Sequence, residues 1–265
     1  MTTLPSFTVD AHARLSAEAY RESWDAYKAS MESNCVDQVV LVGAPDAAAS
    51  RSLLELAGTA GEIAAVAVWV DVKAEDLGEQ LDALKASPKL RSVALPVRQE
   101  ADNHWLVQEE TLRGLRLVAD RGLCLDVEIE PRQLPSIGEL AKAIPGLRIV
   151  VAHMGSPFIG RSEREPWGVH MLNVAAHKNV YSKVSGLAAL DVQPWSVAHQ
   201  RLFVESMVRM FGYERLMFGS DWPGHVEFAT EQQVRAAAAA AAGPMTVTQQ
   251  ESLFGGAARK FYGIS

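Results

Sequence analysis

The chain has 265 residues, of which 48% are hydrophobic and 22% charged, and its formal net charge is −7. This composition excludes a disordered chain, and the negative charge gives no attraction to nucleic acid or to an anionic membrane surface. No apolar run is long enough to span a membrane, and the amino terminus lacks the basic and apolar segments of a signal peptide. We therefore expect a cytoplasmic protein whose partner is a small molecule, and the sequence carries no signal for its oligomeric state.

Short β-rich segments alternate with helical segments along the whole chain. The predicted strands are residues 7–10, 36–43, 63–70, 90–96, 123–129, 147–153, 180–186 and 216–221. The predicted helices, in which apolar residues recur every three or four positions, are residues 16–33, 47–60, 74–87, 108–122, 133–146 and 199–212, with an alanine run at 236–242. Apolar strands that alternate with helices indicate parallel pairing. Eight such units without a linker predict an α/β fold, a single (β/α)8 TIM barrel that forms one domain over residues 1–265.

Ionisable residues lie where the predicted strands end. In a (β/α)8 barrel the active-site groups come from the carboxyl ends of the strands and from the loops that follow them. The first, fifth, sixth, seventh and eighth predicted strands each supply such a group. These residues are His12, Glu128, Glu130, His153, Lys183 and Asp221. The sequence therefore predicts a polar site at one mouth of the barrel.

Five segments of the chain carry recognisable motifs. They are "VDAHAR" (9–14), "LPSIGELAKAIPGLRIVVAHMGSP" (134–157), "NVYSKVSGL" (179–187), "YERLMFGSDWP" (213–223) and "LFGGAARKFYGI" (253–264). In this order they resemble the amidohydrolase-2 family. These are TIM-barrel hydrolases of the amidohydrolase superfamily that include dicarboxypyrone and sugar-acid lactonases. The resemblance covers essentially the whole chain and implies the same fold.

The resemblance also implies roles for four residues. His12 matches the first histidine of the family's His-x-His pair at strand one. His153 matches the histidine of the strand-six motif, although Ala152 replaces the usual acid. Lys183 matches the lysine of the strand-seven motif. Asp221 matches the strand-eight aspartate that usually activates water in this superfamily.

The chain departs from the family pattern at three strands. Arg14 stands where the second histidine of the first strand would be, and strand five offers carboxylates but no histidine. Arg91 matches the first arginine of strand four in lactonase-like members. The "SVALP" that follows it replaces their Arg-His pair, so their specificity is not transferred to this chain.

These departures bear on whether the site holds a metal ion. A catalytic zinc ion ordinarily has three protein ligands and one open position. The candidate ligands are His12, His153 and Asp221, with a strand-five glutamate as a further one. Arg14 opposes a metal, because its permanent positive charge repels a cation and competes for Asp221. We expect no metal cofactor, and the alternative is one divalent ion such as zinc.

The predicted activity is hydrolysis of a small carboxylated lactone, with Asp221, His153 and His12 as the catalytic residues. A carboxylate of ordinary pKa is a weak base for water, so a reactive lactone suits it better than an amide. Cationic neighbours stabilise the developing oxyanion and bind a substrate carboxylate. The predicted substrate-binding residues are Lys183, Arg14, Arg91, Glu130 and Trp222.

Two other functions remain open on the same barrel. One is a lactone isomerase or a decarboxylase, in which the acid–base groups move protons on the substrate instead of activating water. The other is a barrel that has lost catalysis and binds a small carboxylate.

Overall fold

The computed structural model describes residues 7–16, 19–161 and 164–265. It contains eight strands, which match the predicted ones in number and order. The strands are β1 (Val9–Ala13), β2 (Gln38–Val42), β3 (Ile63–Val68), β4 (Leu90–Leu95), β5 (Cys124–Val127), β6 (Ile149–Val151), β7 (Val180–Val184) and β8 (Leu216–Phe218). The first strand is longer at its carboxyl end than predicted, so His12 lies inside β1 rather than after it.

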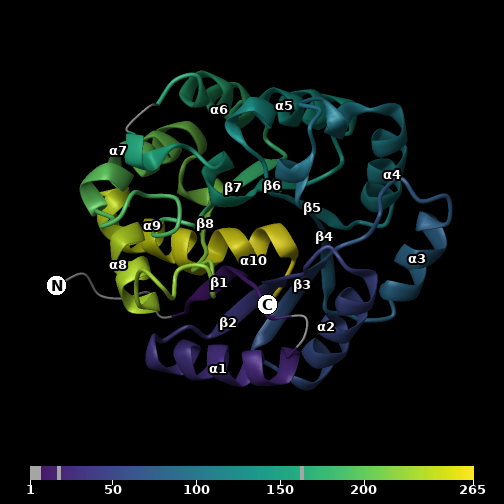
Figure 1. The fold of residues 1–265 in the computed structure, drawn as a ribbon, viewed down its shortest axis with the longest axis horizontal. Helices are drawn as coiled ribbons and strands as arrows, with labels where there is room; N and C mark the ends of the chain where they lie inside the picture. Colours follow the sequence, from purple (N-terminus) through teal and green to yellow (C-terminus); the bar gives the residue numbers. More distant parts are fainter. Residues whose placement is uncertain (1–6, 17–18, 162–163) are drawn as a thin grey trace.

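All neighbouring strands pair in parallel, in the order β1 to β8 along the chain. Figure 1 shows them following one another round a ring. The ring closes through the end of β1, where Ala13 forms a parallel bridge with Trp222 and the Arg14 N–H donates to the Trp222 carbonyl at 2.8 Å. The predicted single TIM barrel is confirmed.

Helices cover the outside of the ring and one of its ends. They are α1 (Tyr20–Ser33), α2 (Ala47–Thr59), α3 (Leu77–Leu84), α4 (Glu109–Asp120), α5 (Leu134–Ala143), α6 (Trp167–Ala175), α7 (Val197–Phe211), α8 (Glu231–Ala242), α9 (Val247–Glu251) and α10 (Ala257–Tyr262). The sequence analysis did not predict α6. The alanine run does form most of α8, as predicted.

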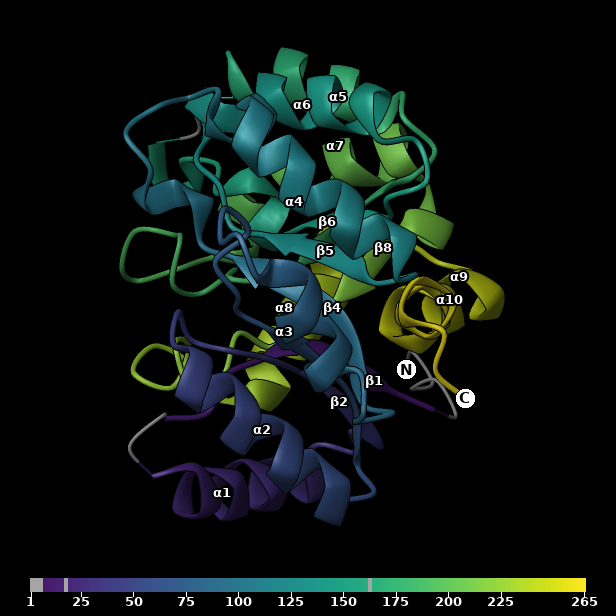
Figure 2. The same ribbon diagram turned by 90° about the vertical axis from the view of Figure 1, so that its right-hand side faces the viewer.

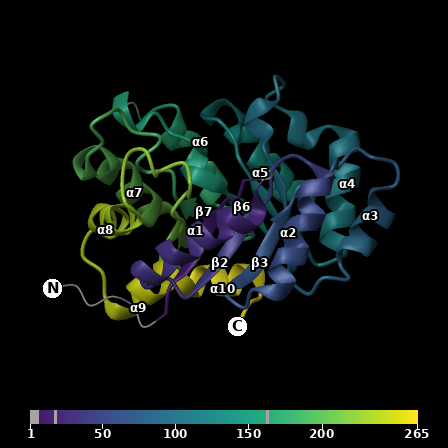
Figure 3. The ribbon, with the colours of Figure 1, turned by 60° about the horizontal axis from the view of Figure 1, so that its bottom comes forward.

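The last helix, α10, closes one end of the barrel. Figures 2 and 3 show α9 and α10 at one end of the barrel, beside the carboxyl terminus and opposite the loops that follow the strands. Inward-facing strand residues, two of them alanine, pack against this helix. They are Val9, Ala11, Val40, Ala65, Cys124, Val150, Tyr181 and Met217, and they contact Ala257, Ala258, Phe261 and Tyr262. Small side chains inside the strands thus leave room for two aromatic rings from the carboxyl terminus.

Among the described residues, no helix combines the length and the apolar character needed to cross a membrane.

Candidate active site

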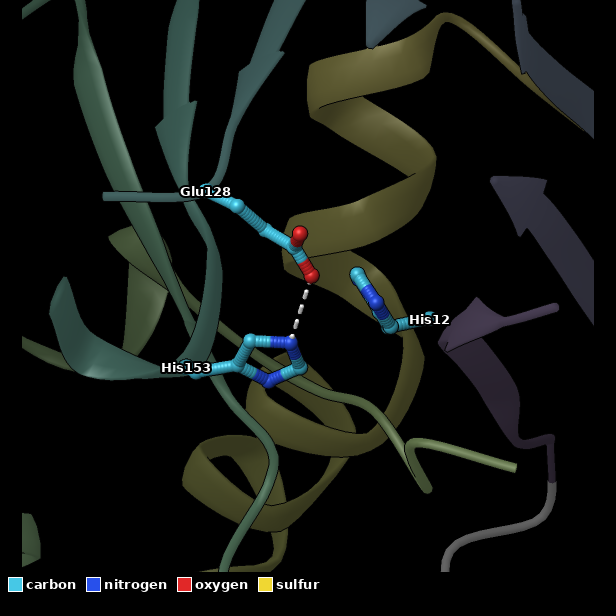
Figure 4. Close-up of side chains that lie close together, drawn as sticks. All are labelled: His12, Glu128 and His153. Atoms are coloured by element: carbon cyan, nitrogen blue, oxygen red, sulfur yellow. Dashed lines mark hydrogen bonds and ion pairs between the residues drawn. The ribbon is translucent and has the colours of Figure 1, made fainter. Parts of the chain in front are cut away.

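Four ionisable side chains converge at the mouth of the barrel. His12 comes from β1, Glu128 follows β5, His153 follows β6 and Asp221 follows β8. His153 Nε2 lies 3.1 Å from Glu128 Oε1 and 3.7 Å from Asp221 Oδ1, and His12 Nε2 lies 3.9 Å from the same Asp221 oxygen. Figure 4 shows the Glu128 carboxylate and the two imidazoles pointing towards one another. The predicted catalytic residues are therefore neighbours.

The backbone is in an uncommon conformation at two of these residues. His153 has φ 51° and Asp221 has φ 65°, in the left-handed region that residues other than glycine seldom adopt. The Asp221 N–H donates to the His12 carbonyl at 2.9 Å, which ties the end of β8 to β1. Strain of this kind persists only where surrounding contacts hold it, and it is concentrated at functional sites.

Ser185, two residues beyond Lys183, orients His153. The backbone N–H of His153 donates to Ser185 Oγ at 3.2 Å, and the same hydroxyl lies 2.9 Å from His153 Nδ1. The ring is thus held on both sides, by Ser185 at Nδ1 and by Glu128 at Nε2. His153 therefore has a fixed orientation before any substrate binds.

Arg14 pairs with Glu128 across the mouth, with 2.6 Å between Nη2 and Oε1. Burial disfavours the ionised form of Glu128, but the contacts with His153 and Arg14 outweigh burial and hold the pKa of this carboxyl well below its ordinary value. Glu128 is therefore a permanent carboxylate. The Arg14 side chain is 37% exposed, so it also faces the open mouth.

Asp221 has the properties of a general base. Its side chain is 18% exposed. Burial raises the pKa of Asp221 above its ordinary value, and His153 and Arg14 oppose that rise. A carboxylate with a raised pKa binds a proton more strongly, which suits the abstraction of a proton from water.

Lys183 lies deeper than predicted. Its side chain is completely buried and forms an ion pair with Asp126 of β5. Its Nζ also lies 3.3 Å from His12 Nδ1. Burial lowers the pKa of Lys183, while Asp126 opposes the change. The expectation that Lys183 contacts substrate is not supported by this position, because the ammonium group is enclosed beneath His12.

His12 is enclosed between cationic neighbours. Burial lowers the pKa of this imidazole well below its ordinary value, and Lys183, His153 and Arg14 lower it further. His12 is therefore neutral at neutral pH. Its Nε2 is buried and has no hydrogen-bond partner among the described residues, so a ligand at the mouth can bind there.

The side chains of the other three predicted residues take no part in this cluster. β5 ends at Val127, so the side chains of Glu128 and Glu130 no longer point to the same face as they would in a strand. Glu130 instead caps a short helical turn and pairs with Arg132 at 2.8 Å. Arg91 is the second residue of β4, at the amino end of the barrel, so it does not reach the mouth. Trp222 packs its ring against another aromatic ring, that of Tyr27, at 5.2 Å.

Sequence analysis missed three buried residues that support the site. Asp10 accepts hydrogen bonds from the backbone N–H groups of His12 and Ser220 at 3.0 and 2.8 Å. Asp126 holds Lys183, and the Tyr262 hydroxyl donates to Asp126 at 2.8 Å. Asp10 and Asp126 stand within otherwise apolar strands, and an acid at such a position was a usable signal of an internal partner.

A pocket opens beside the four converging side chains. It is lined by His12, Arg14 and Glu128 and by the carboxyl ends of β2 and β4. A second pocket adjoins it at those same strand ends and is lined by Trp69 and Trp105. The ionisable groups thus open onto a small pocket, and the two tryptophans line the pocket next to it, which suits a small ring.

Three of the side chains form a plausible metal centre. One nitrogen each of His12 and His153 and one oxygen of Glu128 lie within 4.8 Å of one another. Two imidazoles and a carboxylate are donors that zinc accepts. The predicted ligands were His12, His153 and Asp221 with a strand-five glutamate as a further candidate, and the structure groups that glutamate, Glu128, with the two histidines. Glu128 Oε1 already contacts Arg14 and His153, so in this structure the carboxylate is engaged by these two side chains.

Comparison with known families agrees with this fold. The family model described as "Amidohydrolase" matches residues 6–264. The chain belongs to the amidohydrolase-2 family. The resemblance seen in the sequence motifs is thereby confirmed.

Two members of this family from Burkholderia carry the name L-fucono-1,5-lactonase. The chain is 32% identical to that of Burkholderia ambifaria over 185 residues, which is 70% of this chain and 64% of the relative. It is 28% identical to that of Burkholderia multivorans, over 80% of this chain and 75% of the relative. The match to the first therefore spans somewhat less than two thirds of its length.

Solved structures of other amidohydrolases share the fold. An amidohydrolase from Burkholderia multivorans with bound zinc has a TM-score of 0.89 at 24% identity, and the match covers 98% of this chain and 100% of that one. A Pseudomonas putida protein provisionally named a 2-pyrone-4,6-dicarboxylic acid hydrolase has a TM-score of 0.80 at 22% identity, with 97% of both chains covered. A manganese-bound 5-carboxyvanillate decarboxylase from Novosphingobium aromaticivorans has a TM-score of 0.70 at 12% identity, over 97% of this chain and 96% of that one.

Proposed function

We propose that this amidohydrolase opens a small lactone by hydrolysis, with Asp221 as the general base and without a metal ion. The observation that carries the proposal is the position of Asp221. This carboxylate is partly exposed, has a raised pKa and lies within 4 Å of both imidazoles. The names of the Burkholderia relatives support a lactone as the substrate.

The reaction uses groups that are already in place. Asp221 takes a proton from water as the water oxygen bonds to the lactone carbonyl carbon. The carbonyl oxygen becomes an oxyanion, which the Arg14 guanidinium and His12 stabilise. When the intermediate collapses, the ring C–O bond breaks and the leaving alkoxide takes the proton that Asp221 removed from water. Water and lactone thus give one hydroxy acid, and Asp221 returns to the carboxylate.

Arg14 supports a reaction without a metal ion. It stands at the position of a second histidine ligand and forms an ion pair with Glu128, which is itself one of the three potential ligands. A cation entering the site would have to break this pair and remain close to the guanidinium charge. Arginine in turn supplies the fixed positive charge that an oxyanion needs.

Arg14 also indicates the substrate. Only one of its nitrogens is engaged by Glu128, and the remaining donors of a guanidinium can bind a carboxylate or a hydroxyl group. We therefore propose a carboxylated lactone whose acidic group binds Arg14 and whose ring enters the adjoining pocket beside Trp69 and Trp105. A panel that contains both 2-pyrone-4,6-dicarboxylate and L-fucono-1,5-lactone separates a carboxylate-dependent enzyme from one that acts on neutral sugar lactones.

The test is lactone opening in ¹⁸O-labelled water. We expect one labelled oxygen in the carboxylate of the product. In Asp221→Asn we expect kcat to fall by about 1,000-fold or more, because the general base is removed. Asp25→Asn, on the exposed face of α1, is the matched control and should retain full activity. Full activity in Asp221→Asn contradicts the assigned base.

The same experiment distinguishes the alternative functions. An isomerase converts the lactone without incorporating solvent oxygen, and a decarboxylase releases carbon dioxide from a carboxylated substrate. The decarboxylase alternative has the related fold of the Novosphingobium enzyme in its favour. A protein that binds these compounds and converts none of them is the non-catalytic barrel.

A further inference from the structure

A line of buried contacts leads from the carboxyl-terminal helix to the catalytic histidine of β1. The Tyr262 hydroxyl donates to Asp126 Oδ1 at 2.8 Å, and the same oxygen is paired with the ammonium group of Lys183. Lys183 Nζ then lies 3.3 Å from His12 Nδ1. All four residues are at most 3% exposed, so solvent does not compete for these contacts.

The chemistry of these groups gives each contact a direction. A lysine ammonium group has three protons and no lone pair, so it can only donate. The Asp126 carboxylate accepts one of these protons, and His12 Nδ1 is the acceptor for another. A neutral imidazole that accepts at Nδ1 must carry its proton on Nε2.

We propose that Lys183, held by Asp126 and Tyr262, fixes His12 as the tautomer with its proton on Nε2. That nitrogen is buried, has no partner among the described residues and lies 3.9 Å from Asp221 Oδ1. His12 is then a hydrogen-bond donor aimed at the place where the carbonyl oxygen of the substrate lies beside the base. Lys183, Asp126 and Tyr262 are positioning residues, and α10 is thereby part of the active-site structure.

The tautomer also bears on metal binding. A histidine that binds a metal through Nε2 needs a lone pair there and ordinarily donates its Nδ1 proton to a carboxylate or a carbonyl group. Lys183 instead places a hydrogen-bond donor at Nδ1. The buried ion pair beneath the site therefore opposes a metal ion at His12, independently of the positive charge of Arg14.

The direct test is ¹⁵N NMR of the histidine rings in the intact protein at about pH 8, above the ordinary imidazole pKa. The His12 resonances are assigned by their loss in His12→Gln. We expect a protonated Nε2 and an unprotonated Nδ1. A proton on Nδ1, or an equal mixture of tautomers, overturns the proposal.

Variants test the role of the supporting residues. Lys183→Met leaves Asp126 as a buried unpaired charge, so the double variant Lys183→Met/Asp126→Asn is the safer choice. We expect the His12 tautomer to become mixed in this protein. An unchanged tautomer shows that Lys183 does not set it and contradicts the proposal.

Tyr262→Phe tests the contribution of α10. We expect kcat to fall about 10-fold with KM unchanged, together with a changed His12 ¹⁵N spectrum. Tyr181→Phe is the matched control, because Tyr181 packs against the same helix at Phe261 and its hydroxyl bonds no carboxylate among the described residues. Equal effects of the two substitutions contradict a specific role for Tyr262.

The kinetic part of this proposal rests on the proposed lactonase function, whereas the tautomer does not. If the protein opens no lactone, the function is wrong, and the NMR spectrum still decides where the His12 proton lies.

Discussion

Arg14 combines two effects at the scale of a single residue. It pairs with Glu128 at 2.6 Å and lowers the pKa of Asp221, against the larger effect of burial. A fixed cation therefore favours the ionised form of both carboxylates at the mouth without contributing a metal ligand. At the position of the second histidine of the first motif, Arg14 thus supplies a fixed positive charge in place of a metal-ligating imidazole.

Arg14→Met tests this role through the pH dependence of kcat/KM. Loss of the cation should raise the pKa of Asp221, so the base form is lost at a higher pH and the acidic limb of the profile moves upward. We also expect kcat/KM to fall about 100-fold, because oxyanion stabilisation is lost. Arg14→Lys keeps the charge and should keep the limb in place. Identical profiles for the two variants contradict an electrostatic role.

At the scale of elements, α8 meets α1 through a buried carboxyl group. Glu231, in the first turn of α8, is 2% exposed and accepts a hydrogen bond from Ser30 of α1 at 2.6 Å. Its other oxygen has no partner among the described residues. Burial, together with the nearby Asp10 carboxylate, raises the pKa of Glu231 to about 7.

Glu231→Gln should therefore change stability in a pH-dependent way. The folded protein holds the Glu231 proton more tightly than the unfolded chain does, so its stability falls as the pH rises from about 4.5 to about 7 and is lowest above that range. The amide cannot ionise, and we expect it to increase the free energy of unfolding by about 2 kcal/mol at pH 8 and by nothing at pH 4. Urea denaturation at the two pH values measures this difference.

The exposed residue Glu109 supplies the control for this prediction, because Glu109→Gln removes the same charge from a side chain that is 85% exposed. It should leave stability unchanged at both pH values. A Glu231→Gln protein that is less stable than the parent at pH 8 shows that the carboxylate is stabilising and contradicts the prediction.

The elements themselves were largely predictable, because strand and helix periodicities differ and the strands are mostly apolar. The helix α6 was not predicted, although Trp167, Met171 and Val174 recur at helical spacing. Sequence analysis named Glu130, and not Glu128, as a substrate-binding residue, because which of the two reaches the mouth depends on where β5 ends. The partner of Lys183 was equally hidden, since it lies 57 residues away in the chain.

At the scale of the whole molecule, the carboxyl terminus completes the barrel. Phe261 is completely buried against the ring of Tyr181 at 5.0 Å, and the Cys124 thiol and Arg148 both bond its carbonyl. Strand motifs predict a barrel, but they do not show that its amino end is filled by α10. The contacts of Phe261 with Cys124 and Arg148 join residues more than 100 positions apart, so they leave no periodic pattern in the sequence.

Phe261→Ala should therefore destabilise the protein by about 3–5 kcal/mol, because it removes a large buried side chain and leaves a cavity between α10 and the strands. Phe158→Ala is the matched control, since Phe158 is 53% exposed, and it should change the free energy of unfolding by less than about 0.5 kcal/mol. Chemical denaturation measures both values. Equal effects of the two substitutions show that α10 does not seal the barrel.

The measurement that tests the central claim most directly is lactone hydrolysis by protein whose metal content is determined in the same sample. We predict that kcat and KM stay unchanged when a chelator lowers the metal content to well below one ion per protein chain, because Asp221 activates water and Arg14 provides the positive charge. Zinc added back should give no increase in rate. Activity that disappears on chelation and returns in proportion to bound zinc would contradict the account.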